Sequence, residues 1–118
     1  MGDDHWPGEW LRGVLGVCVM RVLLEGPSHG YAITQRLGAA GLGTVKGGTL
    51  YPLLGRLEEA GHVEVEWRPG EGGPGRKYFA LTPSGRVHAR DQAARWATFT
   101  TMTRELTDGA LASREDLT

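Results

Sequence analysis

The chain has 118 residues, enough for one domain with a modest core and too few for an elaborate enzyme. Its 13 basic and 14 acidic side chains nearly balance, so the net charge of −1 gives by itself no sign of a nucleic-acid partner. There is no apolar run long enough to span a membrane and no secretory signal pattern, and the single cysteine excludes an internal disulfide, so we expect a cytoplasmic protein.

The first two predicted helices lie on either side of a Gly-Pro break. Residues 10–24 carry apolar side chains at helical spacing, namely Leu11, Val14, Leu15, Cys18 and Val22. Gly26-Pro27 interrupts this pattern, and Ser28 is the predicted N-cap of a second, shorter helix over residues 29–37.

A glycine-rich segment, residues 38–48, has no helical pattern and predicts turns. The third predicted helix follows it, with one apolar stripe made of Leu50, Leu53, Leu54, Leu57 and Ala60. Thr49 is its predicted N-cap, Pro52 falls in its first turn, and Gly61 is the predicted end.

Two strands of a hairpin come next. Val63, Val65 and Trp67 alternate with charged residues, which is typical of a half-exposed strand. Residues 69–75 predict a flexible turn. Residues 76–82 predict the returning strand, with Phe79 and Leu81 on one face and Arg76, Tyr78 and Ala80 on the other.

The last predicted helix begins at Thr82-Pro83, an N-cap followed by proline at the first helical position. It extends to about Leu106. Its stripe of apolar and small residues consists of Ala89, Ala93, Trp96, Phe99, Met102 and Leu106.

Three helices, a hairpin and a long helix in this order describe a winged helix-turn-helix with a C-terminal helix, a mostly α fold with a β-hairpin. In such a fold the third helix enters the DNA major groove and the hairpin, or wing, touches the flanking backbone. The predicted organisation is an N-terminal arm (1–9), a winged-helix domain (10–82), a C-terminal helix (83–107) and a tail (108–118). A small helical domain with an idle hairpin is the alternative.

Three motifs resemble the phenolic acid decarboxylase regulator (PadR) family: "HGY", "GTLYPLLGRLEEAGHVEVEW" and "GRKYFALTPSG", in this order and spacing. The resemblance runs from about Trp10 to the end of the last helix and is similar to the shorter branch of the family, which has a single C-terminal helix. It implies a homodimeric transcription factor, usually a repressor, that binds double-stranded DNA and dimerises through its last and first helices.

The sequence departs from the family pattern in three places. Lys46-Gly47 stands where the family often has Ser-Pro before the third helix. Gly55 stands where a basic residue is common, and the wing tip is rich in glycine, so the basic residues of the wing lie on the returning strand.

Nine residues are predicted to contact DNA: Tyr31, Gln35, Arg36, Lys46, Thr49, Tyr51, Arg56, Arg76 and Lys77. The third-helix members suit phosphate or base contacts, the wing cations suit phosphate, and the second-helix members suit the backbone beside the groove. Three alternatives stay open. The first is that Tyr51 packs under the wing instead of contacting DNA, and the second is that Tyr31 belongs to the core. The third is that the wing cations are only a solvated strand end.

An effector site is predicted near the dimer axis, at Trp96, Phe99 and Trp10. Some members of the family look like sensors that hold flat aromatic ligands between tryptophans, and paired aromatic faces suit planar, hydrophobic or cationic guests. Trp6 lines the same region or, like Trp10, anchors the first helix on the partner. The alternative is that Trp96 packs in a dry dimer core.

Other classes of function find little support. No nucleophile with its base, phosphate-cradling loop or carboxylate pair is placed at a defined site, so we predict no enzyme and no cofactor. The four histidines are widely spaced with one cysteine beside them, so we also predict no metal site. A winged-helix interaction module without DNA affinity remains the alternative function.

Overall fold

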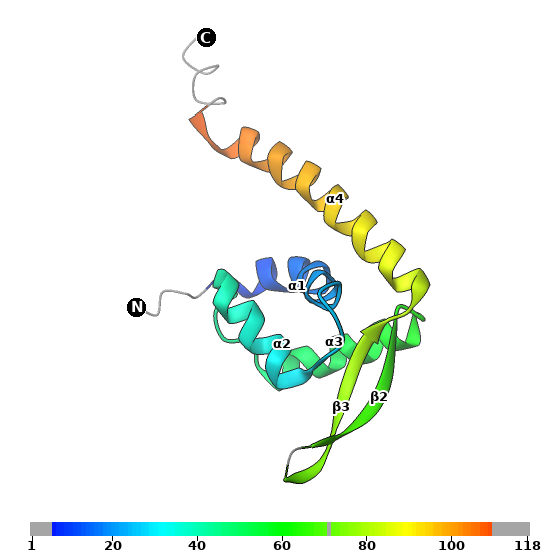
Figure 1. Ribbon diagram of the computed structural model, residues 1–118. Helices are drawn as coiled ribbons and strands as arrows, with labels where there is room; N and C mark the ends of the chain where they lie inside the picture. Colours follow the sequence, from blue (N-terminus) through cyan, green and yellow to red (C-terminus); the bar gives the residue numbers. More distant parts are fainter. Residues whose placement is uncertain (1–5, 71, 110–118) are drawn as a thin grey trace, which may run out of the picture.

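The computed structural model describes residues 6–70 and 72–109. Within these residues, five helical elements and the strands of a three-stranded sheet follow one another (Figure 1). Their bounds are α1 (Gly8–Leu23), β1 (Ser28–His29), α2 (Gly30–Leu37), the π-helical η1 (Gly38–Leu42), α3 (Gly47–Glu59), β2 (Val63–Gly70), β3 (Gly73–Leu81) and α4 (Pro83–Thr107). The predicted winged helix-turn-helix with a long C-terminal helix is confirmed.

The core lies where α1, α2 and α3 meet the base of the hairpin. Most of the apolar stripe predicted for the third helix faces inward: Leu50, Leu53 and Leu54 are buried there. Leu57 is half-buried, and Ala60 at the end of the stripe is exposed. Phe79 and Leu81 cover the core from the hairpin. The alternation of apolar and polar residues thus correctly predicted which face of β3 is buried.

A short strand, β1, was not predicted. It pairs antiparallel with β3, opposing His29 to Tyr78, so the sheet order is β1-β3-β2. The prediction that Ser28 caps the second helix is wrong, because Ser28 lies in β1 and the ring of His29 accepts the capping hydrogen bond from the Ala32 N–H. Two residues are too short a strand to leave a period-2 pattern in the sequence.

Helix and strand ends also differ from the predictions. The first helix begins at Gly8 rather than at residue 10, and residues 38–42 are π-helical rather than a plain turn. The third helix begins at Gly47 after Lys46, not at Thr49. The strands extend to Gly70 and from Gly73 into the predicted turn. Glycine tolerates these conformations without a side-chain signal, which explains why the boundaries were missed.

The long helix α4 is joined tightly to the reading head at its start. Thr82 is the N-cap, as predicted: its hydroxyl accepts from the Gly85 N–H and donates to the Gly61 carbonyl. The Thr82 N–H donates to the His62 carbonyl at 3.0 Å. These bonds fix the direction in which α4 leaves the hairpin.

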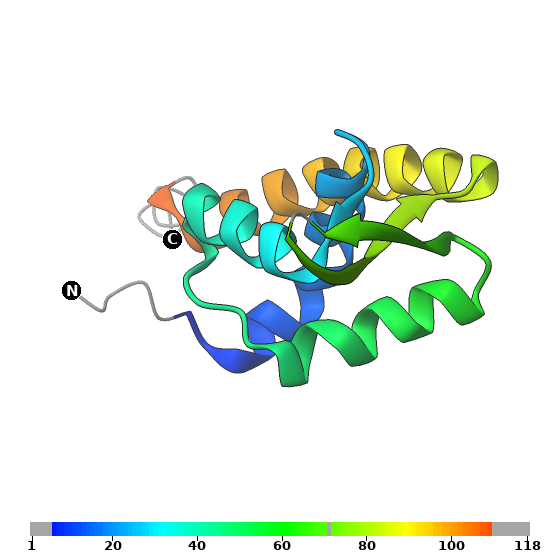
Figure 2. The ribbon, with the colours of Figure 1, turned by 60° about the horizontal axis from the view of Figure 1, so that its bottom comes forward.

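Figure 2 shows α3 and α4 on opposite sides of the molecule. The helix α1 contacts α4, and the far half of α4 extends away from the body (Figure 1). The apolar side chains of that half are largely exposed. Within the described part of the chain, every helix is too short or too polar to traverse a lipid bilayer.

Candidate nucleic-acid interface

The outer face of α3 is open to solvent. Thr49 and Arg56 are exposed on it, opposite the buried leucines. Lys46 occupies the N-cap position with no side-chain hydrogen bond to the helix. Gly48 and Gly55 have nothing within 4 Å of where a Cβ would stand, so the helix backbone itself is accessible along this face. A low, exposed helix face of this kind can approach the floor of a DNA groove.

Tyr51 lies at one edge of that face and is 51% exposed. Its hydroxyl sits against Gly30 at the start of α2, where a Cβ would overlap the oxygen and come within 2.6 Å of Cζ. Its ring centroid is 6.5 Å from that of Phe79 on β3. The side chain therefore joins α3 to α2 and the wing while half of its surface remains open.

The predicted contacts on α2 have partners within the protein. Gln35 Nε2 donates to the Tyr31 hydroxyl at 2.9 Å, and the Tyr31 ring is exposed rather than part of the core. Arg36 forms two hydrogen bonds with Glu25, at 3.2 and 3.0 Å. These bonds lower the pKa of the Glu25 carboxyl and raise that of Arg36. Two of the five guanidinium N–H groups of Arg36 are thus engaged by Glu25, which leaves the others for a phosphate contact.

The wing presents its cations on both faces. Arg76 Nη1 lies 2.9 Å from His29 Nε2, and the Lys77 ammonium lies 5.6 Å from the Phe79 ring centroid. Arg68, which the sequence analysis did not single out, stacks over the Tyr78 ring at 4.4 Å and pairs with Glu66 at 3.0 Å. Arg68 lies on the strand facing Tyr78, diagonal to it and on the same face of the sheet. This placement within the predicted hairpin was the available signal, because cations and aromatic rings on facing strands contact one another.

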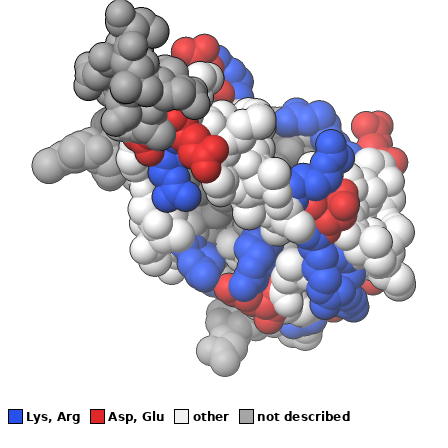
Figure 3. All heavy atoms as spheres, turned by 90° about the horizontal axis from the view of Figure 1, so that it is seen from above, with Lys and Arg blue, Asp and Glu red and all other residues white. Residues whose placement is uncertain are grey.

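The face of the molecule that is uppermost in Figure 1 carries side chains of both charges. Lys and Arg side chains there are interleaved with Asp and Glu (Figure 3). A phosphate backbone would meet both signs of charge on this side.

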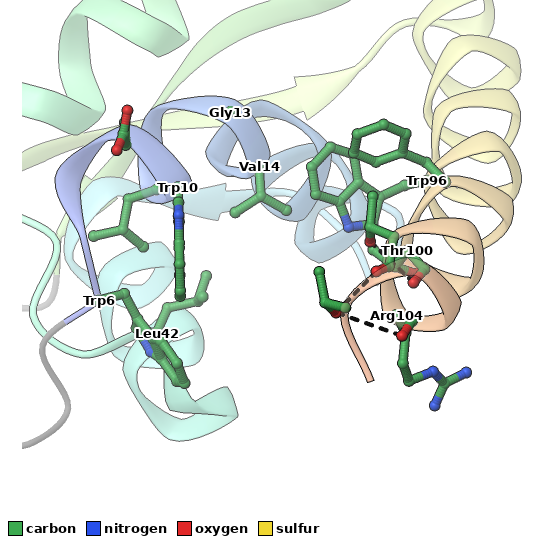
Figure 4. A pocket seen from close by; sticks show the side chains of 13 residues that line it. Trp6, Trp10, Gly13, Val14, Leu42, Trp96, Thr100 and Arg104 are labelled. Carbon is green, nitrogen blue, oxygen red and sulfur yellow. Dashed lines mark hydrogen bonds between the residues drawn. The ribbon is translucent and has the colours of Figure 1, made fainter. Parts of the chain in front are cut away.

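A separate cavity of about 830 Å³ opens between α1 and α4. Trp6 and Trp10 stand on one side of it and Trp96 on the other (Figure 4), with Phe99 also in its lining. The Trp6 indole N–H donates to the Gly41 carbonyl at 2.8 Å, which holds Trp6 against η1. The structure thus brings Trp10, Trp96 and Phe99, the three predicted effector residues, to one cavity.

Two of the histidines that are distant in sequence meet in the fold. The His62 and His88 rings stack with centroids 4.1 Å apart, at the junction of the hairpin with α4. No group of three or more His, Cys, Asp or Glu side chains suited to a metal ion occurs among residues 6–70 and 72–109.

Comparison with known proteins gives consistent relatives. A family model described as "Transcriptional regulator PadR-like family" matches residues 19–91. The transcriptional regulator Rv3488 of Mycobacterium tuberculosis is 37% identical over 79 residues, which are 67% of this chain and 72% of that protein. A PadR-like transcription factor from Bacteroides fragilis has a solved structure that is 33% identical, with a TM-score of 0.69 over 84% of this chain and 95% of that one. A PadR-like transcriptional regulator from Bacillus cereus is 27% identical, with a TM-score of 0.75 over 84% of this chain and 96% of that one.

Proposed function

The chain belongs to the PadR-like family of transcriptional regulators, and from this premise we propose that it is a cytoplasmic, homodimeric repressor that binds a pseudo-palindromic DNA operator. It is a regulator and not an enzyme. One observation carries the proposal: α3 buries its leucines and offers solvent an accessible face beside a wing that carries Arg68, Arg76 and Lys77. Two such helices in a two-fold dimer would read half-sites about 10 base pairs apart.

Within this proposal the nine predicted residues have distinct roles. Arg56 reaches a base edge or a phosphate, while Thr49 and Tyr51 donate to phosphate oxygens and Lys46 attracts phosphate at the start of α3. Arg76 and Lys77 neutralise the backbone under the wing. On α2, the DNA backbone beside the groove is contacted by Tyr31, Gln35 and Arg36.

The arginine roles can be tested on operator sites selected from a random DNA pool. We expect Arg56→Ala to cost about 1–3 kcal/mol on the operator and to relax its specificity, because a base contact is lost. We expect Arg76→Ala to weaken operator and random DNA alike and to lower the salt slope of binding by about one. Fluorescence anisotropy at several salt concentrations measures both effects.

Arg90→Ala serves as the control in that experiment, because Arg90 is an exposed arginine on α4, away from α3 and the wing and on the side of the helix opposite Phe99, Met102 and Leu106. This variant should leave the affinity for DNA, the preference for the operator and the salt slope of binding unchanged. If Arg56→Ala lost affinity equally on operator and random DNA, Arg56 would be removed from the base-reading set. Wild-type binding that showed no salt slope would instead favour the alternative of a protein-interaction module.

The second part of the proposal concerns the dimer interface. On α4 the exposed side chains Phe99, Met102 and Leu106 follow one another at spacings of three and four residues, the pattern of a helix–helix seam. They are 47%, 59% and 60% exposed, which is unusual for large apolar residues grouped on one helix. A second copy of the chain would cover this face together with the start of α1.

The third part of the proposal is a small aromatic or hydrophobic effector in the cavity between α1 and α4. The cavity volume of about 830 Å³ suits a drug-sized molecule, and Trp10, Trp96 and Phe99 supply aromatic faces. A ligand held there would contact both the reading head and α4, so it could change the angle between the two DNA-reading helices of a dimer.

Titration with planar cationic dyes tests the effector site. We expect dye to quench tryptophan emission, and we expect Trp96→Phe to reduce the quenching because one of the three tryptophans that line the cavity is replaced. Trp67→Phe is the matched control, since Trp67 is 71% exposed on the wing and lies outside the cavity lining. Unchanged emission from a folded wild-type dimer would argue against this site for those dyes.

A further inference from the structure

His29 lies between two hydrogen-bond donors. The backbone N–H of Ala32 donates to His29 Nδ1 at 3.3 Å, and the guanidinium nitrogen Nη1 of Arg76 lies 2.9 Å from Nε2. A neutral imidazole has one acceptor nitrogen and one N–H, and a guanidinium has donors only. The ring can therefore accept from one of these partners but not from both.

The bond to α2 is the one that the fold holds in place. His29 is the N-cap of α2, and its backbone is paired with Tyr78 in the sheet. Burial lowers the pKa of the His29 ring, and the charge of Arg76 lowers it further, so the neutral form is favoured. With Nδ1 accepting from Ala32, the hydrogen is on Nε2, and two donors then lie 2.9 Å apart.

Further positive charge faces the same place. Arg68 and Arg76 are directly opposed across the hairpin, a pairing of like charges that is unfavourable without a counter-charge. Arg68 stacks over the Tyr78 ring, and the edge of Tyr78 meets the His29 ring with centroids 5.3 Å apart. Glu66 offsets part of the charge of Arg68. An imidazole N–H and two guanidiniums on one patch call for an anionic acceptor with several oxygens.

We propose that His29 and Arg76, flanked by Arg68, form a single phosphate-binding site at the junction of α2 and the wing, and that its occupant is a phosphate of the DNA backbone. A phosphate oxygen accepts from the Nε2–H and from the guanidinium at once, which removes the conflict between the two donors. This inference rests on the proposed DNA binding, and it adds His29 as a contact that also positions Arg76.

The test is a double-mutant cycle on operator DNA with His29→Asn and Arg76→Ala. Asparagine is a good N-cap, so His29→Asn keeps the bond to α2 and removes the N–H directed at Arg76. We expect each single variant to weaken binding about 10-fold and the double variant to weaken it little more than either, because both side chains hold the same phosphate. Independent contacts would give about 100-fold.

The salt dependence separates a phosphate contact from a merely structural role. Arg76→Ala should lower the salt slope by about one, and His29→Asn should lower it by a similar amount although it removes no charge, because Arg76 then no longer holds the phosphate. His88→Asn on α4 is the control and should bind as the wild type does. Urea denaturation should show that His29→Asn remains folded.

Each outcome decides one question. Wild-type affinity in His29→Asn, or a double variant that equals the product of the singles, would overturn this site while DNA binding itself stands. A wild-type protein without salt-dependent DNA binding would overturn the proposed function as well. Saturation of the His29 NMR shifts by millimolar inorganic phosphate without DNA would assign the site to a free anion and overturn its assignment to the DNA backbone.

Discussion

Replacing Met102 and Leu106 together by glutamate is expected to convert the dimer to a monomer and to weaken operator binding on the order of 100-fold. Both side chains are largely exposed and lie on one face of α4, where a second copy is proposed to pack. Four carboxylates brought into that interface would be buried without partners. A monomer offers one reading helix, so it loses the advantage of binding two half-sites at once.

The matched control is Ala97→Glu with Thr101→Glu. These residues have the same spacing of four and the same added charge, but they lie on the other side of α4, because each residue advances about 100° around a helix. Sedimentation and light scattering should give about twice the chain mass of 12.8 kDa for the control and the single-chain mass for Met102→Glu/Leu106→Glu. A dimeric Met102→Glu/Leu106→Glu protein would place the interface elsewhere.

The second large effect is expected from Gly85→Ala, which should lower the free energy of unfolding by about 3 kcal/mol. Gly85 is buried in the first turn of α4, and a Cβ there would overlap the carbonyl oxygen of His62 and come within 2.8 Å of its carbonyl carbon. That carbonyl cannot turn away freely, because it accepts from the Thr82 N–H at 3.0 Å. Backbone would have to move to relieve the overlap.

Gly55→Ala is the control for the helix-forming effect of the added methyl group. Gly55 lies inside α3 with open space around the position of its Cβ, so this change should raise stability by up to about 1 kcal/mol. Urea denaturation followed by circular dichroism measures both variants. If Gly85→Ala unfolded at the wild-type urea concentration, the close contact of α4 with the His62 carbonyl would not be required for stability.

Much of the fold follows from local patterns. Every third or fourth residue of the third helix is leucine, and alternate residues at the base of the hairpin are apolar, so their buried faces were predicted correctly. Thr82-Pro83 likewise marks the start of α4. In each case the signal is a residue type at a fixed spacing along one element, which is all that an isolated element needs to express.

The candidate site is less predictable. Arg36 is hydrogen-bonded to Glu25, eleven residues away in the sequence, and His29 meets Arg76, which is 47 residues away. Tyr51 fits against Gly30 because that position lacks a Cβ. Neither the ion pair nor the conflict of donors at His29 has a pattern in the sequence, because each depends on two segments being brought together.

The sequence by itself determined the order of the four main helices and the hairpin, the buried faces of α3 and of the base of the hairpin, and the family, because apolar periodicity, caps and short motifs are local properties of the chain. Only the tertiary structure decided which polar side chains meet. In the fold, β1 adds a third strand to the hairpin, Arg36 forms an ion pair with Glu25, and His29 lies beside Arg76. Contacts between distant segments depend on packing angles and on the reach of individual side chains, and periodicity encodes neither.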